Sequence, residues 1–502
     1  MAKGSMPVLV GVGQSMSQWD GSDGAEGAPS PLSLATNASK EALKDAGVDA
    51  SNIDTITFVR IFEDSVRNAP HPHGHNTNLP GTLARDIGAQ PERLIYSDVG
   101  GQSPQALANE MASRIHAGEI EVALVAGSEA NRASKGARKN GVEIDWADSA
   151  DADYEDRGFG GEMLSRAEIK HGLIAPAFFY ALFENAIAAR EGRSRSGQRE
   201  AMAKLFQPFT EIAASNPYAQ FPKELSIDFL ATPSPSNYEF ADPFLKWHIA
   251  QDAVNQGAAF LMISEEKADE LGVAKDKRVY LHGSGEASDD LLSERPRLDG
   301  SWAMQQAIGR ALDQAGKTPG GIAAFDLYSC FPCAVFSSTQ ELGIDPFTDE
   351  RPITLTGGLP FFGGPGNNYS MHGIASMSDW LRENDGAFGL VLANGGWMTK
   401  EAVGVWSTAR PDAFQLVEKA AKPHEKVTLD PAASAGTIET YTVVHGREGP
   451  SHGIIFGRTE SGDRFIAKAS EAALDELRND ESPVGRPVTV TQDGEVSTFD
   501  FA

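Results

Sequence analysis

The feature that most constrains the fold is a repeat inside the chain. Residues 41–59 (EALKDAGVDASNIDTITFV) align without gaps with residues 310–328 (RALDQAGKTPGGIAAFDLY), and both segments have the pattern of a helix, a glycine and a strand. The segments VALVAGS (122–128) and GLVLANG (389–395) resemble each other in the same order. We therefore predict a duplicated α/β fold in which matching loops of the two halves converge on one site.

Strand and helix signals alternate through the first half. Hydrophobic runs at 53–59, 94–99 and 122–128 predict strands, and an amphipathic helix is expected between Pro31 and Gly47. Strands that alternate with amphipathic helices are typical of an α/β domain with a mostly parallel sheet.

Changes of composition predict the domain boundaries. We expect a first half over residues 7–285, interrupted at about 135–245 by an inserted loop domain rich in charged and aromatic residues. The second half is expected over 286–412. Residues 425–502 contain short β-type runs separated by turn signals, which predict a small all-β module of the OB type.

The charge balance and the cysteine count exclude several function classes. The chain has 43 Lys and Arg against 70 Asp and Glu, a net charge of −27, so we expect it to bind neither nucleic acid nor an anionic membrane surface. Its apolar runs fall short of the ~18 residues that a membrane helix needs, so no membrane insertion is expected. Two cysteines cannot form a disulfide framework, which favours a cytoplasmic protein.

Cys330 and Cys333 are the first chemical candidates. A predicted strand delivers them to the start of a predicted helix, where backbone amides and the helix dipole stabilise a thiolate. Three interpretations remain open: a redox pair, one nucleophilic or acid–base thiol beside a buried neighbour, and two ordinary core residues. One Cys-x-x-Cys motif with no partner pair does not support a zinc site.

Two histidine-containing loops are the next candidates. The glycine-rich stretch 355–377 ends near His372, which can polarise a carbonyl or accept a proton, or can simply be a structural residue of a turn. The segment HPHGH (71–75) has metal-ligand spacing, but it has no carboxylate or cysteine neighbours in the sequence. We interpret it as a surface loop and expect no metal site.

These features together resemble the thiolase superfamily. The duplicated halves, the insertion, NPYAQFP (216–222) and YSCFP followed by a glycine-rich loop with a histidine are most similar to bacterial thiolase-like proteins related to sterol-carrier-protein-type thiolases. The resemblance covers roughly residues 7–410, and the tail resembles an OB-like domain appended to such proteins. It implies a five-layered αβαβα fold of two βαβαβαββ halves, a homodimer, and coenzyme A thioesters as substrate or ligand without a permanently bound cofactor.

The motifs that carry the resemblance depart from the family pattern. In VGGQSPQAL, Gly100 stands where the family has its nucleophilic cysteine, so the usual acyl-cysteine cannot form there. Cys330 keeps the thiol of the family's His-Asp-Cys-Phe motif, and Tyr328 replaces its histidine.

The remaining motif positions agree with the family pattern only in part. By resemblance, His372 matches the histidine that polarises the thioester oxygen, whereas Asn394 replaces the cysteine of the second acid–base motif. Gly100, Gly101 and Gly395 are expected to line the loops of an oxyanion hole.

Three functions follow from the resemblance. The first is an acyltransferase of the acetyl-CoA acetyltransferase type in lipid metabolism, with Cys330 as nucleophile or base and His372 stabilising the oxyanion. The second is a non-catalytic protein that binds coenzyme A or acyl-CoA. The third is an aldolase-type lyase acting on a CoA-thioester side chain, with Tyr328 or Tyr369 as the acid–base group.

An acidic protein that binds coenzyme A must offer local positive charge. The basic residues of the insertion are candidates for this role: Arg193, Arg195, Arg199 and Lys204.

Overall fold

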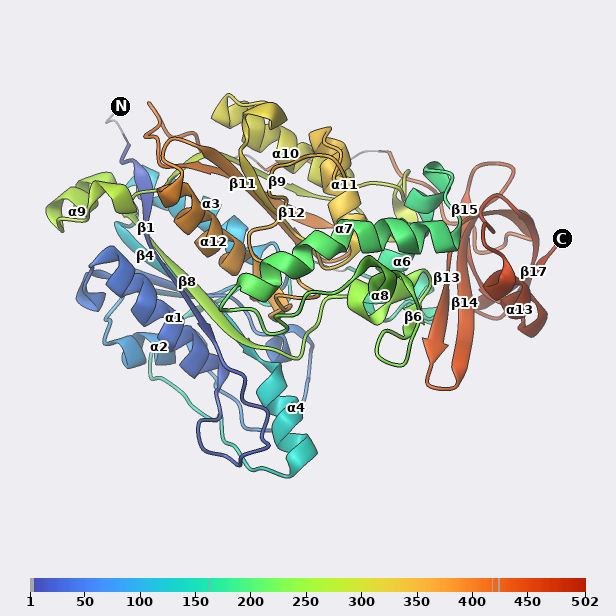
Figure 1. The fold of residues 1–502 in the computed structure, drawn as a ribbon, viewed down its shortest axis with the longest axis horizontal. Coiled ribbons are helices and arrows are strands. Elements are labelled where there is room, and N and C mark those ends of the chain that lie inside the picture. The colour runs from blue at the N-terminus through green and yellow to red at the C-terminus, as the bar shows by residue number, and fades with distance from the viewer. Residues whose placement is uncertain (1–3, 162, 418, 423–424) are drawn as a thin grey trace.

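The computed structural model describes residues 4–161, 163–417, 419–422 and 425–502. Two sheets with helices around and between them form the body of the molecule, and a β barrel stands at one end (Figure 1). Within the described residues, no helix combines the length and the apolar character that crossing a membrane requires.

The first sheet is built by the first half of the repeat. Its strands, in spatial order, are β1 (Pro7–Met16), β8 (Asn255–Ser264), β4 (Val122–Ala130), β2 (Thr55–Phe58), β3 (Arg93–Tyr96) and β5 (Glu155–Asp156). β2, β3 and β4 run parallel, whereas β8 is antiparallel to both β1 and β4. The two residues of β5 cover the outer edge of β3. β5 therefore pairs with the backbone of β3, an edge at which another strand would otherwise be able to pair.

The second sheet is smaller. Its strands, in spatial order, are β10 (Ala324–Leu327), β11 (Phe388–Gly395), β12 (Lys400–Ser407) and β9 (Tyr280–Ser288). β9 starts at Tyr280 and pairs with β12, so the second sheet includes residues that precede 286, the expected start of the second half; the expected domain boundaries stay predictions. The sequence YLHGSGEAS lacks the hydrophobic pattern of a strand, so β9 was not predicted.

One strand of the expected second half is not formed in the described structure. Residues 352–353 lie beside β10 and accept hydrogen bonds from Phe325 N and Leu327 N, at 2.8 and 3.1 Å. Pro352 has no N–H to donate, and the segment does not continue as a strand.

The helices complete the expected αβαβα layers. α3 and α12 contact strands of both sheets and form the middle layer, α1 and α2 pack on the first sheet, and α10 packs on the second. The helices are α1 (Pro31–Ala46), α2 (Leu79–Ile87), α3 (Ser103–Ala117), α4 (Asn131–Asn140), α5 (Arg166–Lys170), α6 (Pro176–Arg190), α7 (Arg195–Ser215), α8 (Ile227–Ala231), α9 (Glu265–Glu270), α10 (Trp302–Ala315), α11 (Pro332–Leu342), α12 (Tyr369–Glu383) and α13 (Glu471–Asn479). The expected fold class is confirmed.

Local signals set the ends of α1 as predicted. The side chain of Ser30 accepts a hydrogen bond from Ser33 N, and Pro31 is the first helical residue. Gly47 ends the helix in the left-handed conformation at φ 66°, where a glycine costs little.

The repeat is also visible in how strands meet helices. A Cβ placed on Gly11 or Gly13 of β1 would lie 2.2 or 2.1 Å from a carbonyl oxygen of α1. A Cβ on Gly283 or Gly285 of β9 would lie 2.0 Å from a carbonyl oxygen of α10. Both halves thus use a pair of glycines to bring a helix backbone directly onto a strand.

The close packing of β9 and α10 leads to a test of stability. We expect Gly285→Ala to lower the free energy of unfolding by about 1–3 kcal/mol, because the added methyl group meets the backbone of Ala307 and not a movable side chain. Gly309 in α10 has no atom within 4 Å of an added Cβ, so Gly309→Ala is expected to stabilise by about 1 kcal/mol. Urea unfolding of both variants measures the difference, and equal effects would contradict this packing.

The C-terminal residues form a closed ring of five strands. These are, in ring order, β13 (Ala435–Gly446), β14 (Gly449–Arg458), β15 (Arg464–Ala469), β17 (Val496–Phe501) and β16 (Pro487–Asp493). A β domain is thereby confirmed, and its OB type stays a prediction. The domain is not all-β, because α13 lies between β15 and β16, with Ala473 and Leu477 buried at helical spacing.

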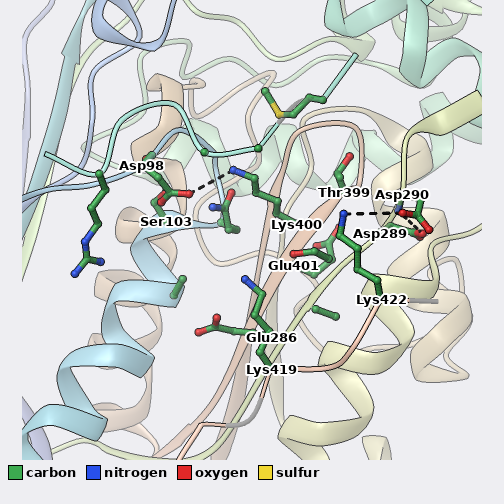
Figure 2. Close-up of a pocket in the computed structure, with 18 of the residues that line it drawn as sticks. Asp98, Ser103, Glu286, Asp289, Asp290, Thr399, Lys400, Glu401, Lys419 and Lys422 are labelled. Carbon is green, nitrogen blue, oxygen red and sulfur yellow. Dashed lines mark hydrogen bonds and ion pairs between the residues drawn. The ribbon is translucent and has the colours of Figure 1, made fainter. Parts of the chain in front are cut away.

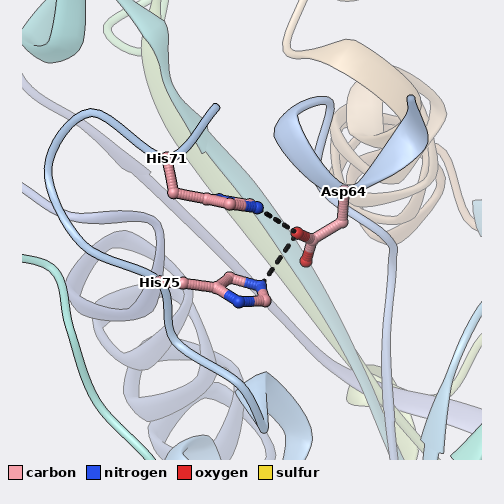
Figure 3. A group of neighbouring side chains, drawn as sticks. All are labelled: Asp64, His71 and His75. Atoms are coloured by element: carbon pink, nitrogen blue, oxygen red, sulfur yellow. Dashed lines mark hydrogen bonds and ion pairs between the residues drawn. The ribbon is translucent and has the colours of Figure 1, made fainter. Parts of the chain in front are cut away.

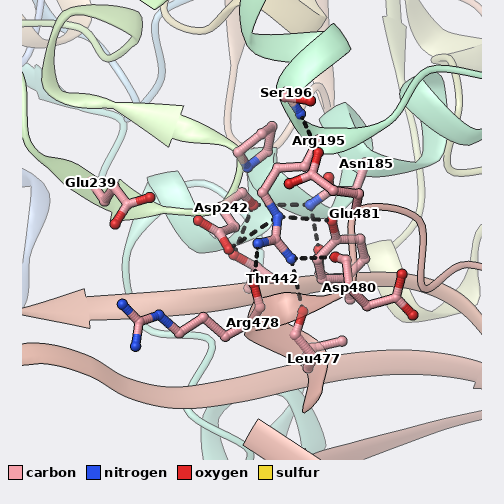
Figure 4. Close-up of polar contacts among 12 residues, drawn as sticks. Asn185, Arg195, Ser196, Glu239, Asp242, Thr442, Leu477, Arg478, Asp480 and Glu481 are labelled. Carbon is pink, nitrogen blue, oxygen red and sulfur yellow. Dashed lines mark hydrogen bonds and ion pairs between the residues drawn. The ribbon is translucent and has the colours of Figure 1, made fainter. Parts of the chain in front are cut away.

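The inserted residues attach this barrel to the body. β6 (Glu239–Ala241) pairs with β13 and with β7 (Phe244–Leu245), so the insertion and the barrel share one sheet. The helix α7 begins at the barrel and runs toward the body (Figure 1). At its first turn, the buried guanidinium of Arg195 donates to the carbonyl oxygens of Leu477, Arg478 and Asp480 (Figure 4).

Candidate functional site

The candidate site lies where loops from both halves meet around Gly101. Ser370, at the start of α12, donates its hydroxyl to Gly101 O at 2.9 Å. A Cβ on Gly101 would lie 2.3 Å from Tyr328 Oη, after β10, and 2.5 Å from Asn394 O, near the end of β11. The convergence expected from the repeat therefore places Gly101, Tyr328 and Asn394 in direct contact.

Cys330 is close to this point, but its thiol is not activated. The side chain of Asn394 lies 3.8 Å from Cys330 Sγ, and the residue is 8% exposed. Burial raises the pKa of the thiol to about 12, although the hydroxyl of Tyr180 on α6 acts in the opposite direction. We expected the start of α11 to lower this pKa; removal of the thiol from water outweighs the helix amides.

Cys333 is packed behind Cys330, in the first turn of α11. Both cysteines are free and buried, and Cys333 Sγ lies 3.5 Å from Tyr180 O. Burial raises the pKa of Cys333 well above its usual value. This environment is typical of a core residue and gives no support to a redox pair.

His372 is a neutral, buried imidazole. Its Nδ1 lies 2.7 Å from Gln14 Oε1 on β1, which fits the tautomer with the proton on Nδ1. Burial lowers the pKa of the ring to about 3. Nε2 has no hydrogen-bond partner among the described residues. In this state Nε2 can accept a hydrogen bond but cannot donate one. The resemblance implies that His372 donates a hydrogen bond to an oxyanion, and this state does not fit that role.

The two candidate tyrosines are neutral as well. Burial raises the pKa of Tyr328 and of Tyr369 well above the usual value. Their rings meet edge to face with centroids 5.4 Å apart. Tyr369 Oη is engaged by Thr356 Oγ1 at 2.5 Å, whereas the hydroxyl of Tyr328 faces Gly101.

Gly100 has a backbone conformation that suits glycine. Its φ is 145°, and an added Cβ would lie 2.0 Å from Gln102 Oε1. The same oxygen lies 1.9 Å from the position of a Cβ on Gly395. Gln102 thus fills the space between the two glycine loops.

Sequence reasoning missed Gln102, Tyr180 and Gln14. Each contacts a residue far along the chain; Tyr180 and Gln14 belong to no family motif, and Gln102 lies within VGGQSPQAL without being one of its expected site residues. Tyr180 donates to Gly396 O at 2.8 Å and accepts from the Asn394 side chain at 2.9 Å. Only the fold reveals that the inserted helix α6 contributes to the site.

Several buried polar atoms around Gly101 lack partners among the described residues. They are His372 Nε2, Asn394 Oδ1 and Gln102 Oε1. Buried polar atoms are nearly always paired in folded proteins, so a group of unpaired ones requires an explanation. A bound ligand that supplies hydrogen-bond donors is one such explanation.

Gln102 also lines a cavity of about 810 Å³ (Figure 2). Its walls come from the start of α3, from β9 and β12, and from the linker before the barrel. Lys400 donates to Val99 O at 2.8 Å and lies 3.4 Å from Asp98 Oδ2. Glu401, a buried carboxyl of the wall, has a raised pKa because of desolvation, so it tends to be neutral.

The linker adds positive charge at this cavity. Lys419, Lys422 and Lys426 are exposed and line it, and Figure 2 shows Lys419 and Lys422 on one side. Lys426 pairs with Asp290 at 3.0 Å. Asp290 is buried, whereas the three lysines are exposed, so their ammonium groups remain accessible from solvent.

The basic residues expected to bind coenzyme A lie elsewhere. Arg195 is engaged by the carbonyl oxygens of the barrel and by Asp242 at 3.4 Å, which gives it a structural role. Arg199 also pairs with Asp242, at 3.2 Å. Arg193 bonds to Gln198, Lys204 pairs with Glu200, and their role in binding coenzyme A stays a prediction.

The chain resembles known proteins over its whole length. A crystal structure of a monomeric SCP2-thiolase-like protein type 1 from Mycobacterium smegmatis is 38% identical, with full coverage of both chains and a TM-score of 0.83. Residues 416–495 match the family model of the thiolase-like protein type 1 additional C-terminal domain. That similar protein is described as monomeric, and for this chain the expected homodimer stays a prediction.

Two more distant similarities concern enzymes. An acetyl-CoA acetyltransferase of Methanocaldococcus jannaschii is 32% identical over 135 residues, a match that spans 26% of this chain and 33% of that enzyme. The Ltp2–ChsH2(DUF35) aldolase is 18% identical over 81% of this chain and 98% of that one, with a TM-score of 0.60. At that identity the likeness shows the fold alone.

Proposed function

Because the chain belongs to the SCP2-thiolase-like proteins of type 1, we propose that it binds a coenzyme A thioester without forming an acyl-enzyme. The observation that carries the proposal is the state of the two candidate nucleophile positions. Gly100 has no side chain, and the Cys330 thiol is buried with its pKa raised to about 12. A thiolate, the form that attacks a thioester, is therefore not available at neutral pH.

The cavity beside Gln102 is the proposed entry for the ligand. It borders the loop at Asp98 and Gln102, and it is large enough for a drug-sized molecule. Lys419, Lys422 and Lys426 offer positive charge for the phosphates of coenzyme A. Gln102 lines this cavity and has an unpaired buried oxygen, and the unpaired atoms of Asn394 and His372 are further candidate contacts for the thioester.

Calorimetric titration with acetyl-CoA tests the place of binding. We expect a variant with Lys419, Lys422 and Lys426 changed to alanine to bind at least 10-fold more weakly at low salt, because each lysine near a phosphate contributes about 1 kcal/mol. A matched variant changes the exposed Lys40, Lys44 and Lys275, and its affinity is expected to match the wild type. Equal affinity in both triple variants would exclude this cavity.

The same samples test the absence of an acyl-enzyme. Intact-protein mass after incubation with acetyl-CoA is expected to equal the mass of the untreated chain, in the wild type and in Cys330→Ala. An acetyl-sized gain that disappears in Cys330→Ala would overturn the proposal in favour of an acyltransferase.

One observation favours a second candidate function, cleavage of a β-hydroxyacyl-CoA. His372 Nε2 is an unpaired acceptor, so it can accept a hydrogen bond from a substrate hydroxyl. The cleavage gives a carbonyl compound and the thioester enolate and moves the hydroxyl proton to the enolate carbon. The neutral hydroxyl of Tyr328 is the candidate relay, because it can give its proton to that carbon and receive the substrate's hydroxyl proton in its place. The fold shared with the Ltp2–ChsH2(DUF35) aldolase is compatible with this chemistry. A role in lipid metabolism and a cytoplasmic location remain predictions.

A further inference from the structure

The segment HPHGH gains a carboxylate partner in the folded chain. The rings of His71 and His75 stack with centroids 3.9 Å apart, and both face Asp64 in the short helix Glu63–Ser65. Nε2 of His71 lies 3.7 Å from Asp64 Oδ1, and Nε2 of His75 lies 3.1 Å from the same oxygen (Figure 3). Two imidazole nitrogens thus converge on one carboxylate oxygen.

The spacing of these three atoms suits a single metal ion. In a tetrahedral zinc site with bonds of about 2.0–2.1 Å, neighbouring ligand atoms lie about 3.4 Å apart. The two measured distances lie on either side of that value, and all three ligand atoms lie within 4.8 Å of one another. The two rings stack with an angle of 23° between their planes, so rotation about the side-chain bonds is the movement that brings both Nε2 lone pairs onto one ion.

Neighbouring groups orient the ligands in the way that metal sites require. The hydroxyl of Tyr96 donates to Asp64 Oδ2 at 2.5 Å, which leaves Oδ1 for the imidazoles. The carboxylate of Glu63 lies 3.6 Å from Nδ1 of His71, on the opposite side of the ring from Nε2. A carboxylate behind a histidine ligand is a recurrent feature of metal sites.

A second cluster in the same molecule shows what a non-metal arrangement looks like. Glu239, Asp242 and His445 also lie within ligand distance of one another. There the guanidinium groups of Arg195 and Arg199 pair with the carboxylates, and they neutralise the charge that would attract a cation. Around Asp64, the described partners of Oδ1 are the two imidazoles, which can themselves bind a metal.

We propose that Asp64, His71 and His75 bind a divalent transition-metal ion of the Zn²⁺ type. Two imidazoles and one carboxylate are ligands that Zn²⁺ accepts, and three protein ligands leave a fourth position open. A cavity of about 200 Å³ adjoins the three residues and gives room for a water or a small ligand there. His75 is 42% exposed in its side chain, so the ion can enter from solvent.

Zinc titration of the full-length protein tests the site. After treatment with a chelator, Zn²⁺ is added in competition with a chromogenic chelator, and Co²⁺ is added to record d–d absorption. We expect one Zn²⁺ per chain and a tetrahedral Co²⁺ spectrum. The double variant His71→Gln/His75→Gln is expected to bind Zn²⁺ at least 10-fold more weakly and to lose the Co²⁺ spectrum.

A matched double variant, His116→Gln/His452→Gln, removes two other partly buried histidines and is expected to bind as the wild type does. The melting temperature without metal shows whether the variants fold. Zn²⁺ is expected to raise that temperature in the wild type and the matched variant but not in His71→Gln/His75→Gln. Absence of Zn²⁺ binding, or equal binding by both double variants, would overturn the proposal.

Discussion

Replacing Arg195 by alanine is expected to lower the free energy of unfolding by about 3–5 kcal/mol, because it removes one ion-pair partner of a buried carboxylate and the shared donor of several carbonyl oxygens. The guanidinium is 7% exposed and lies 3.4 Å from Asp242 Oδ2. It also donates to the last carbonyl groups of α13, with distances of 2.8 Å to Leu477 O and to Asp480 O (Figure 4). Alanine leaves these carbonyl oxygens without their donor, and Asp242 keeps Arg199 and His445 as partners.

The expected loss of stability in Arg195→Ala is concentrated at the barrel. Arg195 joins residues 477–480 to the insertion, so the barrel is expected to unfold at a lower temperature than the body in calorimetry. Hydrogen exchange should rise first in α13 and β13. Arg478→Ala is the matched control, since the side chain of Arg478 is exposed and only its carbonyl takes part. Its expected effect is under about 0.5 kcal/mol. A comparable loss in both variants would contradict this role of Arg195.

Cys330 in the native protein is expected to react with iodoacetamide about 1000-fold more slowly at pH 8 than an ordinary thiol. The reactive form is the thiolate, and burial raises the pKa of this thiol from 9.0 to about 12. The expected rate increases with pH throughout the range in which the protein stays folded. A cysteine activated for acyl transfer would instead react fastest near neutral pH.

Intact-protein mass over time measures this rate. The variant Cys333→Ala isolates Cys330, and the same protein unfolded in urea gives the rate of the free thiol. We expect slow labelling in the native state and rapid labelling in urea. Native labelling as fast as that of a small free thiol would show that the site opens, and it would restore Cys330 as a nucleophile candidate.

Features that depend on neighbouring residues could be predicted from the sequence. The repeat of helix, glycine and strand placed α1 and β2 correctly, because apolar spacing and caps such as Ser30 and Gly47 act within one turn. The fold class followed from the order of these units. β9 was missed because its residues are buried by the glycine contacts of α10, which no local pattern records.

The candidate site could be predicted only in part. Gly100, Tyr328, Cys330, His372 and Asn394 were found because motifs carry them. Their protonation states could not be predicted. The direction of the pKa shifts of Cys330 and His372 depends on burial by distant segments. Tyr180 from the insertion and Gln14 from the first strand contact the site across large separations in sequence.

The sequence alone determined the duplicated α/β architecture, the position of the barrel, and the lack of a side chain at position 100. Only the tertiary structure decided what surrounds each group. The segment HPHGH was interpreted as a plain surface loop because no carboxylate is near it in the sequence, yet Asp64 lies 3.1 Å from His75. The physical reason is the range of the interactions: helix caps and hydrophobic periodicity are local, whereas desolvation, ion pairing and metal coordination depend on residues that only the folded chain brings together.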